Sequence, residues 1–466
     1  MKKTGGTKTM KTIALVSLGC PKNRIDSEHI LGALGQAGYV VTDDPLSAAV
    51  TIVNTCGFIE PAKEESIRTI LELAEAKKTD PKKRLVVVGC LAQRYGEELG
   101  RELPEIDGLA GTEADDEIVA LLRRVERGER PILVRVGDRR PVNDPVQPRL
   151  LTTGPHTAYL KIAEGCNHRC GFCAIPSIRG PFRSRTRQAI VAEAGQLVAM
   201  GVRELILVAQ DATAYGGDLG PGENLIRLLG ELDRLPGLTW IRLLYLHPGS
   251  VEEALIEAIA ESRHICRYFD LPMQHASDRV LRAMGRGETG KSLRALVQLI
   301  RRRLPEAYLR GSFIIGHPGE DESDFQELLD FLEFARLDHA GFFAYSREEG
   351  TRSAELEGQI PEEVKAGRLR RAARRQRRLA SEANRRRVGT SIDVLVERHR
   401  RGAYPLVGRS EKDAPDIDGM VFLRPGTDVA DTDWPQPGDF VRARITHNTA
   451  FDLYGEFDRR FRRLPE

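Results

Sequence analysis

Short apolar segments alternate with longer helical segments along the first third of the chain. The apolar segments lie at residues 13–16, 50–53 and 85–88. We predict helices beginning near Asp26, near Glu60 and after Cys90. Repeated strand–helix units of this kind are typical of a parallel sheet. The pattern therefore predicts a parallel α/β domain over residues 11–145.

The middle of the chain continues the alternation with six strand-like segments. These strands are predicted at residues 159–163, 204–208, 240–245, 268–271, 312–315 and 341–345. Between them, segments such as 225–232 place leucines at helical spacing. Six such units predict a partial (βα)6 barrel, whose chemistry lies at the carboxyl ends of the strands. We assign residues 152–387 to this domain, including a helix that connects it to the next.

From about Val388 the pattern changes to short strands broken by Gly, Pro and Asp. Four of these strands are predicted at residues 392–396, 404–407, 420–423 and 440–445. About five short strands with turn signals indicate a small β-barrel, over residues 388–456. The predicted fold class is therefore α/β throughout the first two domains, followed by this β-barrel.

Composition limits the classes of function. The 466 residues suit about three domains, and 70 lysines and arginines against 68 acids do not suggest a protein that coats nucleic acid. No run of about 18 apolar residues and no signal core are present, so we expect a cytosolic protein without a membrane partner. Seven cysteines in such a protein are expected to be reduced ligands or catalytic groups.

Three of the cysteines, Cys166, Cys170 and Cys173, form a Cys-x3-Cys-x2-Cys run. Three thiolates and one open position suit an iron–sulfur cluster that binds a substrate at its fourth iron. The alternatives are a zinc site or three buried thiols, although structural zinc usually takes four ligands. His168 lies inside the run and is expected to be a loop residue with a backbone or solvent contact.

Three further cysteines, Cys20, Cys56 and Cys90, each follow one of the first predicted strands. The ends of parallel strands meet at one edge of a sheet, where ligands bind in such folds. A second cluster is the natural inference, and three unrelated small residues in tight turns are the alternative. The seventh, Cys266, lies in an apolar stretch and is expected to be a buried core thiol.

Polar residues follow the predicted strands of the middle domain. They include Gln210, Asp211, His247, Gln274, His275, Gly316 and Tyr345. A loop cap explains any single one of them, but together they outline the mouth of one cavity.

Two regions near the end of the chain have opposite charge. Residues 368–387 carry ten arginines and one acid, Glu382, and predict a helix with a basic face. This helix is either a solvated connector or a contact to phosphates or to an acidic patch. Residues 388–456 carry 12 acids and 8 lysines or arginines. Phosphate binding depends on cations, so the last domain is better suited to a basic protein than to RNA.

The chain resembles the radical S-adenosylmethionine (SAM) methylthiotransferases over nearly its whole length, with a last domain similar to a TRAM domain. Within that family it is most similar to the group that modifies an aspartate of small-subunit ribosomal protein number twelve. The motifs that carry the resemblance are Ser17–Asn23, Cys56–Ile59, Gly165–Cys166, Cys173–Gly180, Pro272–His275 and Tyr345–Ser346. The tRNA-modifying branch differs at three of these sites. The chain departs mildly from its own group at His317 and Asp321.

The resemblance implies two 4Fe–4S clusters, SAM and no catalytic side chain beyond the cluster ligands. One cluster would be held by Cys166, Cys170 and Cys173, and the sulfur-carrying one by Cys20, Cys56 and Cys90. SAM contacts are implied for Phe172, Gln210, Asp211 and Gly316. Reductive cleavage of SAM would give a radical that removes a hydrogen from the β-carbon of the target aspartate. A cofactor must supply this reactivity, because an unactivated C–H bond is too strong for acid–base catalysis by side chains.

The partners that the resemblance implies are the ribosomal protein, free or on the ribosome, and an electron donor. The enzyme is expected to be a monomer, with tRNA an unlikely partner. Two alternatives remain, namely methylthiolation of an adenosine in tRNA and a non-catalytic iron–sulfur module.

Overall fold

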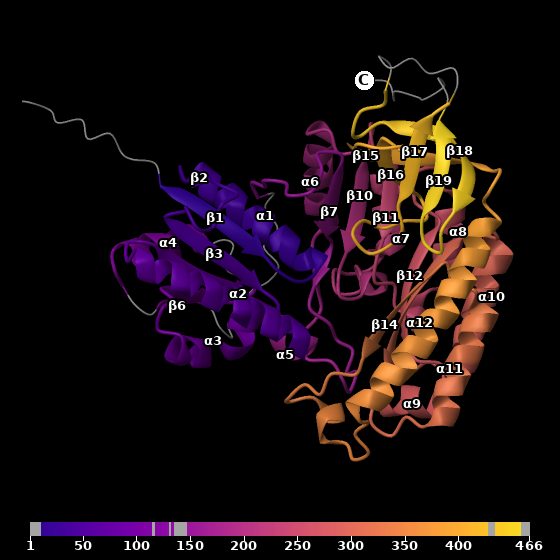
Figure 1. The fold of residues 1–466 in the computed structure, drawn as a ribbon, viewed down its shortest axis with the longest axis horizontal. Helices are drawn as coiled ribbons and strands as arrows, with labels where there is room; N and C mark the ends of the chain where they lie inside the picture. The colour runs from indigo at the N-terminus through magenta and orange to yellow at the C-terminus, as the bar shows by residue number, and fades with distance from the viewer. Residues whose placement is uncertain (1–10, 114–116, 130–131, 135–146, 427–433, 458–466) are drawn as a thin grey trace, which may run out of the picture. The chain divides into compact units, whose positions relative to one another are not determined.

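The computed structural model describes residues 11–113, 117–129, 132–134, 147–426 and 434–457 (Figure 1). The chain divides into two compact units. The first comprises residues 1–152, 164–167 and 173–183, and the second comprises residues 153–163, 168–172 and 184–466. The predicted end of the first domain, residue 145, lies outside the described residues.

The helices and strands of the first unit are β1 (Thr12–Ser17), α1 (Pro21–Gln36), β2 (Val40–Val41), β3 (Val50–Thr55), α2 (Glu60–Thr79), β4 (Arg84–Gly89), α3 (Cys90–Glu102), β5 (Gly108–Ala110), α4 (Ile118–Glu126), β6 (Ile132–Val134) and α5 (Ile175–Arg179). Two short strands, β8 (Ala163–Glu164) and β9 (Arg183–Ser184), lie where the units alternate along the chain.

The second unit contains β7 (Thr157–Lys161), α6 (Arg187–Ala199), β10 (Glu204–Val208), η1 (Ala212–Ala214), α7 (Leu225–Leu232), β11 (Trp240–Leu243), η2 (Pro248–Ser250), α8 (Glu253–Glu261), β12 (Tyr268–Gln274), α9 (Asp278–Ala283), α10 (Gly290–Arg303), β13 (Tyr308–Ile315), α11 (Glu322–Ala335), β14 (His339–Ala344), η3 (Arg352–Glu355), α12 (Glu362–Arg385), β15 (Ser391–His399), β16 (Leu406–Ser410), β17 (Val421–Pro425), β18 (Phe440–Asn448) and β19 (Leu453–Phe457).

The first unit is a six-stranded parallel sheet in the order β2-β1-β3-β4-β5-β6. Helices α1 and α4 pack on one face of it, and α2 and α3 pack on the other. The predicted α/β class is confirmed. The first helix begins at Pro21, earlier than the predicted Asp26, because proline suits the first helical turn and Cys20 serves as its N-cap.

The partial barrel of the second unit contains all six predicted strands. They form two parallel sheets, β11-β10-β7 and β12-β13-β14, and a bridge between Ile241 and Ile265 lies between them. The predicted (βα)6 architecture is therefore confirmed. None of the helices in the described part of the chain has the length and apolar character needed to cross a bilayer.

The predicted small β-barrel closes in the order β15-β16-β17-β19-β18 (yellow in Figure 1). Its interior holds fully buried side chains such as Val394, Leu423 and Phe457. Buried and more exposed residues alternate along β17, β19 and most of β18, as expected for a barrel with one dry face, whereas β16 is buried throughout.

Helix α12 carries the arginine run and packs against α11 and β14. Arg368 pairs with Glu320 at 2.8 Å, and Arg371 pairs with Glu322 at 2.6 Å. A groove of about 320 Å³ beside these pairs is lined by Gln326, Leu329, Arg371, Arg374, Arg375 and Arg378. Much of the basic face therefore meets an acidic patch of the same chain, one of the outcomes that the sequence left open.

Buried ion pairs join the C-terminal barrel to the amino ends of the partial-barrel strands. Glu204, the first residue of β10, pairs with Arg242 at 2.9 Å and with Arg409 at 2.5 Å. All three side chains are fully buried. Arg409 belongs to β16, so this pairing fixes the small barrel to the core.

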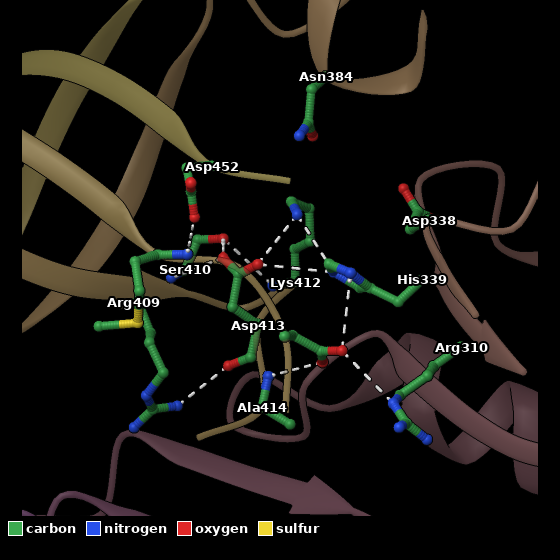
Figure 2. A network of polar contacts seen from close by, with 12 residues as sticks. Arg310, Asp338, His339, Asn384, Arg409, Ser410, Lys412, Asp413, Ala414 and Asp452 are labelled. Carbon is green, nitrogen blue, oxygen red and sulfur yellow. Dashed lines mark hydrogen bonds and ion pairs between the residues drawn. The ribbon is translucent and has the colours of Figure 1, made fainter. Parts of the chain in front are cut away.

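The loop after β16 extends this junction to other strands. Figure 2 shows Lys412, Asp413 and His339 converging, with the Lys412 ammonium 2.9 Å from Asp413 and 3.2 Å from the His339 ring. Asp418 accepts a hydrogen bond of 2.6 Å from the Tyr268 hydroxyl and lies 3.4 Å from Arg310. This loop therefore covers the amino ends of β12, β13 and β14.

Candidate active site

The cysteine set Cys20, Cys56 and Cys90 lies at the carboxyl edge of the sheet of the first unit. Cys20 is the N-cap of α1, Cys56 follows β3 directly, and Cys90 is the first residue of α3. The sheet order places β2 and β3 on opposite sides of β1, and ligands bind at such switch points in doubly wound sheets. The sheet order thus brings the three predicted loops to one edge.

A glycine allows the first two loops to approach closely. Gly19 has a φ of +90°, and a Cβ atom there would lie 2.9 Å from the Cβ of Cys56 and 3.3 Å from its sulfur. Burial raises the pKa of Cys56 to about 12, and the nearby Cys90 and Cys20 act in the same direction. The thiols of this group therefore oppose one another's ionisation, because like charges repel.

A buried arginine lies beside this group. Arg179, the last residue of α5, is 2% exposed and donates hydrogen bonds to Glu164 at 2.8 and 2.9 Å and to Asn23 at 2.6 Å. It also lies 3.5 Å from the sulfur of Cys90. Burial raises the pKa of the Cys90 thiol, and the guanidinium opposes that effect because a cation favours the thiolate.

Helix α5 connects the two cysteine sets through the chain. Ala174, which directly follows Cys173, packs with Ile178 against Cys90. Arg179 is not among the residues predicted for this site. It lies in the motif Cys173–Gly180, but a sequence motif does not reveal which distant side chains its residues contact.

The second cysteine set lies in the loop after β7 and β8. The backbone amide of Cys166 donates to the carbonyl of Gly180 at 3.0 Å, and that of Gly171 donates to Met284 at 2.7 Å. All three cysteines of the loop are partly exposed. Cys266, by contrast, is 1% exposed, which confirms the predicted core thiol.

The donor chemistry of both sets fits iron–sulfur clusters, whose iron atoms take cysteine thiolates as ligands. Three thiolates in each set would leave one iron of a four-iron cluster without a protein ligand. Across the described ranges, no group of three cysteine, histidine or carboxylate side chains is arranged around a single metal ion.

Two stacked histidines lie near the second cysteine set. The rings of His168 and His247 are 4.0 Å apart and nearly parallel. His168 Nε2 is 2.7 Å from Asp211 Oδ2, and His247 Nδ1 is 3.3 Å from Glu288. The expectation that His168 makes only a backbone or solvent contact is therefore wrong, because tertiary structure brings Asp211 to it.

This cluster has defined protonation states. Burial would raise the pKa of Asp211, but hydrogen bonds from His168 and Thr213 outweigh burial and lower it. Burial and the nearby Arg286 lower the pKa of His247 to about 4. At neutral pH, Asp211 is therefore a carboxylate and His247 is uncharged. Arg286 also lies 3.9 Å from the sulfur of Cys170.

Two residues at the carboxyl ends of strands have strained backbones. Tyr245 follows β11 with a φ of 63°, and Gln274 ends β12 with a φ of 68°. This left-handed conformation costs about 1–3 kcal/mol per non-glycine residue, and it concentrates at functional sites. Both strained residues lie at the carboxyl ends of strands, where the sequence predicts the cavity mouth.

Three of the residues predicted to contact SAM follow the carboxyl ends of strands, Gln210 and Asp211 after β10 and Gly316 after β13, and Phe172 lies in the cysteine loop. Gly316 has a φ of +81°, and a side chain there would lie 2.4 Å from the Lys365 side chain. Phe172 and Gln210 are partly buried, and Asp211 is almost fully buried. Their contacts with SAM remain predictions.

The two departures from the family motifs have structural explanations. His317 is fully buried, with its ring 2.8 Å from the Ser353 hydroxyl and against Tyr345. Asp321 is the N-cap of α11 and accepts hydrogen bonds from the amides of Ser323 and Asp324. Members of the resembling group usually have threonine at this position, and aspartate and threonine both serve as N-caps, so the aspartate preserves the helix start.

Three family models match successive parts of the chain. Residues 12–111 match the uncharacterized protein family UPF0004, residues 160–332 the radical SAM superfamily, and residues 388–457 the TRAM domain. A radical SAM domain uses SAM together with a [4Fe–4S] cluster, which confirms these two cofactors.

Curated relatives match the whole chain. A protein of Pelotomaculum thermopropionicum named ribosomal protein uS12 methylthiotransferase RimO is 51% identical over 445 residues, which are 95% of this chain and 98% of the relative. The protein of the same name from Desulforudis audaxviator is 49% identical, over 95% and 96% of the two chains. The chain belongs to the RimO family of methylthiotransferases. The predicted enzyme class is thereby confirmed.

Solved structures support the fold of the RimO-family chain. The radical SAM methyltransferase TsrM from Kitasatospora setae aligns over 74% of each chain with a TM-score of 0.55 and 16% identity. The cobalamin-dependent radical SAM enzyme OxsB aligns over 79% of this chain and 56% of its own, with a TM-score of 0.50. At such low identity the likeness concerns the fold alone.

Proposed function

We propose that this enzyme adds a methylthio group to the β-carbon of an aspartate of ribosomal protein uS12. The observation that carries the proposal is the presence of two separate sets of three cysteines. Transfer of a methylthio group requires both a carbon-centred radical and a source of sulfur. The names of the relatives, at 45–51% identity, support uS12 as the substrate.

The two cysteine sets would hold two [4Fe–4S] clusters. The ligands are Cys166, Cys170 and Cys173 for the cluster that binds SAM, and Cys20, Cys56 and Cys90 for the second. A cluster held by Cys166, Cys170 and Cys173 would supply the electron for the reductive cleavage of SAM. Phe172, Gln210, Asp211 and Gly316 would position SAM, with the His168 ring holding the Asp211 carboxylate in place.

Arg179 would stabilise the thiolates of the second set. Its guanidinium is held by Glu164 and Asn23, so its positive charge remains beside Cys90 without freedom to move away. Buried thiolates need such compensation because burial alone favours the neutral thiol. We infer that Arg179 is a positioning residue for the sulfur-carrying site.

The remaining partners follow from this reaction. An electron donor of unidentified type would reduce the enzyme, which we expect to act as a monomer in the cytosol. The tRNA alternative is not favoured, because the relatives are named for a protein substrate and the motifs differ from those of the tRNA branch.

The decisive experiment incubates the anaerobically reconstituted enzyme with SAM, a chemical reductant and either uS12 or tRNA. Mass spectrometry of uS12 should show an increase of about 46 Da, because CH3S replaces hydrogen on the modified aspartate. Modification of tRNA without modification of uS12 would contradict the proposed substrate.

A Cys20→Ala variant tests the assignment of two clusters. It should lose about half of the bound iron and still cleave SAM, but fail to transfer a methylthio group. The matched control is Cys266→Ala, which removes a buried thiol outside both sets. Normal transfer by Cys20→Ala would show that the first set holds no essential cluster.

A further inference from the structure

A series of buried polar contacts runs from the C-terminal barrel to the carboxyl ends of the partial-barrel strands. It begins at Asp418 in the loop after β16, whose carboxylate lies 3.4 Å from the guanidinium of Arg310 on β13. Arg310 in turn pairs with Asp270 on β12 at 2.8 Å. The other oxygen of Asp270 accepts a hydrogen bond of 2.9 Å from the backbone amide of Tyr245. We call Asp418, Arg310 and Asp270 the polar chain.

The register of the strands holds the middle of the polar chain in place. Asp270 and Arg310 are direct cross-strand neighbours on β12 and β13, and Arg310 is also the neighbour of His339 on β14 (Figure 2). The side chains of Asp418, Asp270 and Arg310 are only 1%, 4% and 13% exposed, so each charge needs a partner. Burial would lower the pKa of Arg310, but Asp270 and the other acidic groups around it outweigh burial and raise it. Arg310 therefore keeps its positive charge between the two carboxyl groups.

Tyr245 is the residue at which the polar chain reaches the candidate active site. Its φ of 63° lies in the left-handed region, which is unfavourable for a tyrosine. Asp270 holds its amide, and its carbonyl accepts a hydrogen bond of 3.0 Å from the amide of Ala212. Ala212 follows Asp211, which is the N-cap of η1 and a predicted SAM contact. The strained residue is therefore held on both sides, and one of the two contacts leads back to the C-terminal barrel.

We propose that the docking of the C-terminal barrel fixes the geometry of the SAM site through the polar chain. Asp418 holds Arg310, Arg310 orients the Asp270 carboxylate, and Asp270 keeps Tyr245 in its left-handed conformation next to the turn that carries Asp211. The members of the polar chain are thus positioning residues. The inference rests on the proposed function in one respect, since it takes Asp211 as a SAM contact.

Asp413 provides a matched control on the same loop. Its side chain is also 1% exposed, and its carboxylate lies 2.9 Å from Lys412, 3.6 Å from His339 and 2.7 Å from the Ser410 hydroxyl. These contacts stay within the junction at the amino ends of the strands. Asp413→Asn should therefore weaken the junction without changing the SAM site, whereas Asp418→Asn should do both.

Double-mutant cycles of unfolding test the polar chain without relying on SAM chemistry. In Asp270→Asn one acceptor oxygen remains for two donors, so either the Tyr245 amide or Arg310 loses its partner. Tyr245→Gly adopts a left-handed backbone without needing that contact. Asp270→Asn and Asp418→Asn should therefore destabilise the Tyr245→Gly protein less than the wild type, by about tenfold in the unfolding equilibrium constant. Asp413→Asn should destabilise both proteins equally.

The kinetics of SAM cleavage by the reconstituted full-length enzyme report on the site itself. With excess reductant, Asp270→Asn should raise the KM for SAM about tenfold, because small displacements of positioning groups weaken productive binding. Asp418→Asn acts through Arg310 and should raise the KM about threefold, whereas Asp413→Asn should keep the wild-type KM.

Three results would overturn the proposal. They are additive effects of Asp270→Asn and Tyr245→Gly on unfolding, an unchanged KM for SAM in Asp270→Asn, and equal rises in KM in Asp418→Asn and Asp413→Asn. The last result would mean that the stability of the junction alone governs the site. Absence of SAM cleavage by the wild type would contradict the proposed function, and the unfolding cycles would still decide the role of the polar chain.

Discussion

The six strands of the partial barrel end in two chemically different environments. At the amino ends, charged side chains are buried and paired, as Glu204 is with Arg242 and Arg409. At the carboxyl ends, Tyr245 and Gln274 hold left-handed backbones, and His247 is kept uncharged. The amino ends therefore contain buried ion pairs, whereas the carboxyl ends contain two strained backbone residues and a histidine with a lowered pKa.

The two ends of the same strands therefore have separate roles, since the amino ends stabilise the fold and the carboxyl ends hold the residues of the candidate active site. Strained residues persist only where the surrounding structure determines their conformation. The paired amino ends, together with the core, supply that rigidity without occupying the site. Changes at the carboxyl ends should therefore affect activity first, and changes at the amino ends should affect stability first.

The largest effect is expected at the carboxyl end. Cys170→Ala removes a proposed cluster ligand, and we expect SAM cleavage to become undetectable while the chain stays folded. Iron analysis and detection of the cleaved nucleoside after incubation with reductant measure the loss. Cys266→Ala is the control and should keep both iron and activity. Retained cleavage by Cys170→Ala would show that the loop is not the site of SAM chemistry.

The next largest effect is expected at the amino end. Glu204→Gln leaves the buried Arg242 without its carboxylate and Arg409 with Glu397 alone, which should lower the free energy of unfolding by about 3–5 kcal/mol. Denaturant unfolding measures this loss, and SAM cleavage by the folded protein should remain close to wild type.

Glu129→Gln is the matched control for that variant. Glu129 pairs with Arg124 and Arg127 on the surface of the first unit, so its loss should change stability much less. Equal effects of the two variants would contradict the structural role given to the amino ends.

The pH dependence of the unfolding free energy should reflect the ionisation of the Glu204 carboxylate. Burial would raise the pKa of Glu204, but Arg409 and Arg242 outweigh it and lower the pKa from 4.5 to about 2. Because the folded-state pKa is lowered, this stabilisation is fully present above about pH 4.5. It is lost as the pH falls towards 2.

Unfolding free energies measured between pH 6 and the acid limit should therefore fall less steeply in Glu204→Gln than in the wild type. Parallel pH profiles for the two proteins would indicate that Glu204 does not keep its charge in the folded state.

The smallest effect is expected from relieving the backbone strain at Gln274. Gln274→Gly removes the cost of a left-handed backbone, so we expect a gain of about 1 kcal/mol in unfolding free energy together with reduced methylthio transfer. Gln326→Gly, in the exposed part of α11, should instead lose about 1 kcal/mol because that residue is helical. A loss of stability in both variants would argue against strain at Gln274.

Local patterns predicted the elements well. The strands at 13–16, 50–53 and 85–88 form where expected, as do the six strands of the partial barrel. Their apolar periodicity depends on neighbours along the chain, so it can be read without the fold. The start of α1 was misplaced because Cys20 and Pro21 begin the helix without an apolar signal.

Contacts between distant residues were not predictable in the same way. His168 was expected to contact backbone or solvent, but it pairs with Asp211 because the fold brings β10 beside the cysteine loop. Arg179 and Cys90 are 89 positions apart in the chain and 3.5 Å apart in space. No local pattern encodes such a pair, since it depends on how the sheet and helices pack.

The sequence by itself determined the cysteine sets, the order of strands and helices, and the family of this enzyme, because each depends on residue type and spacing along the chain. Only the tertiary structure decided which charges are buried. The acids Asp413 and Asp418 are paired inside the junction, whereas Arg400 and Arg444 are exposed on the C-terminal barrel. Net charge is a sum over residues, but a partner contacts only the surface, and burial determines which residues contribute to it.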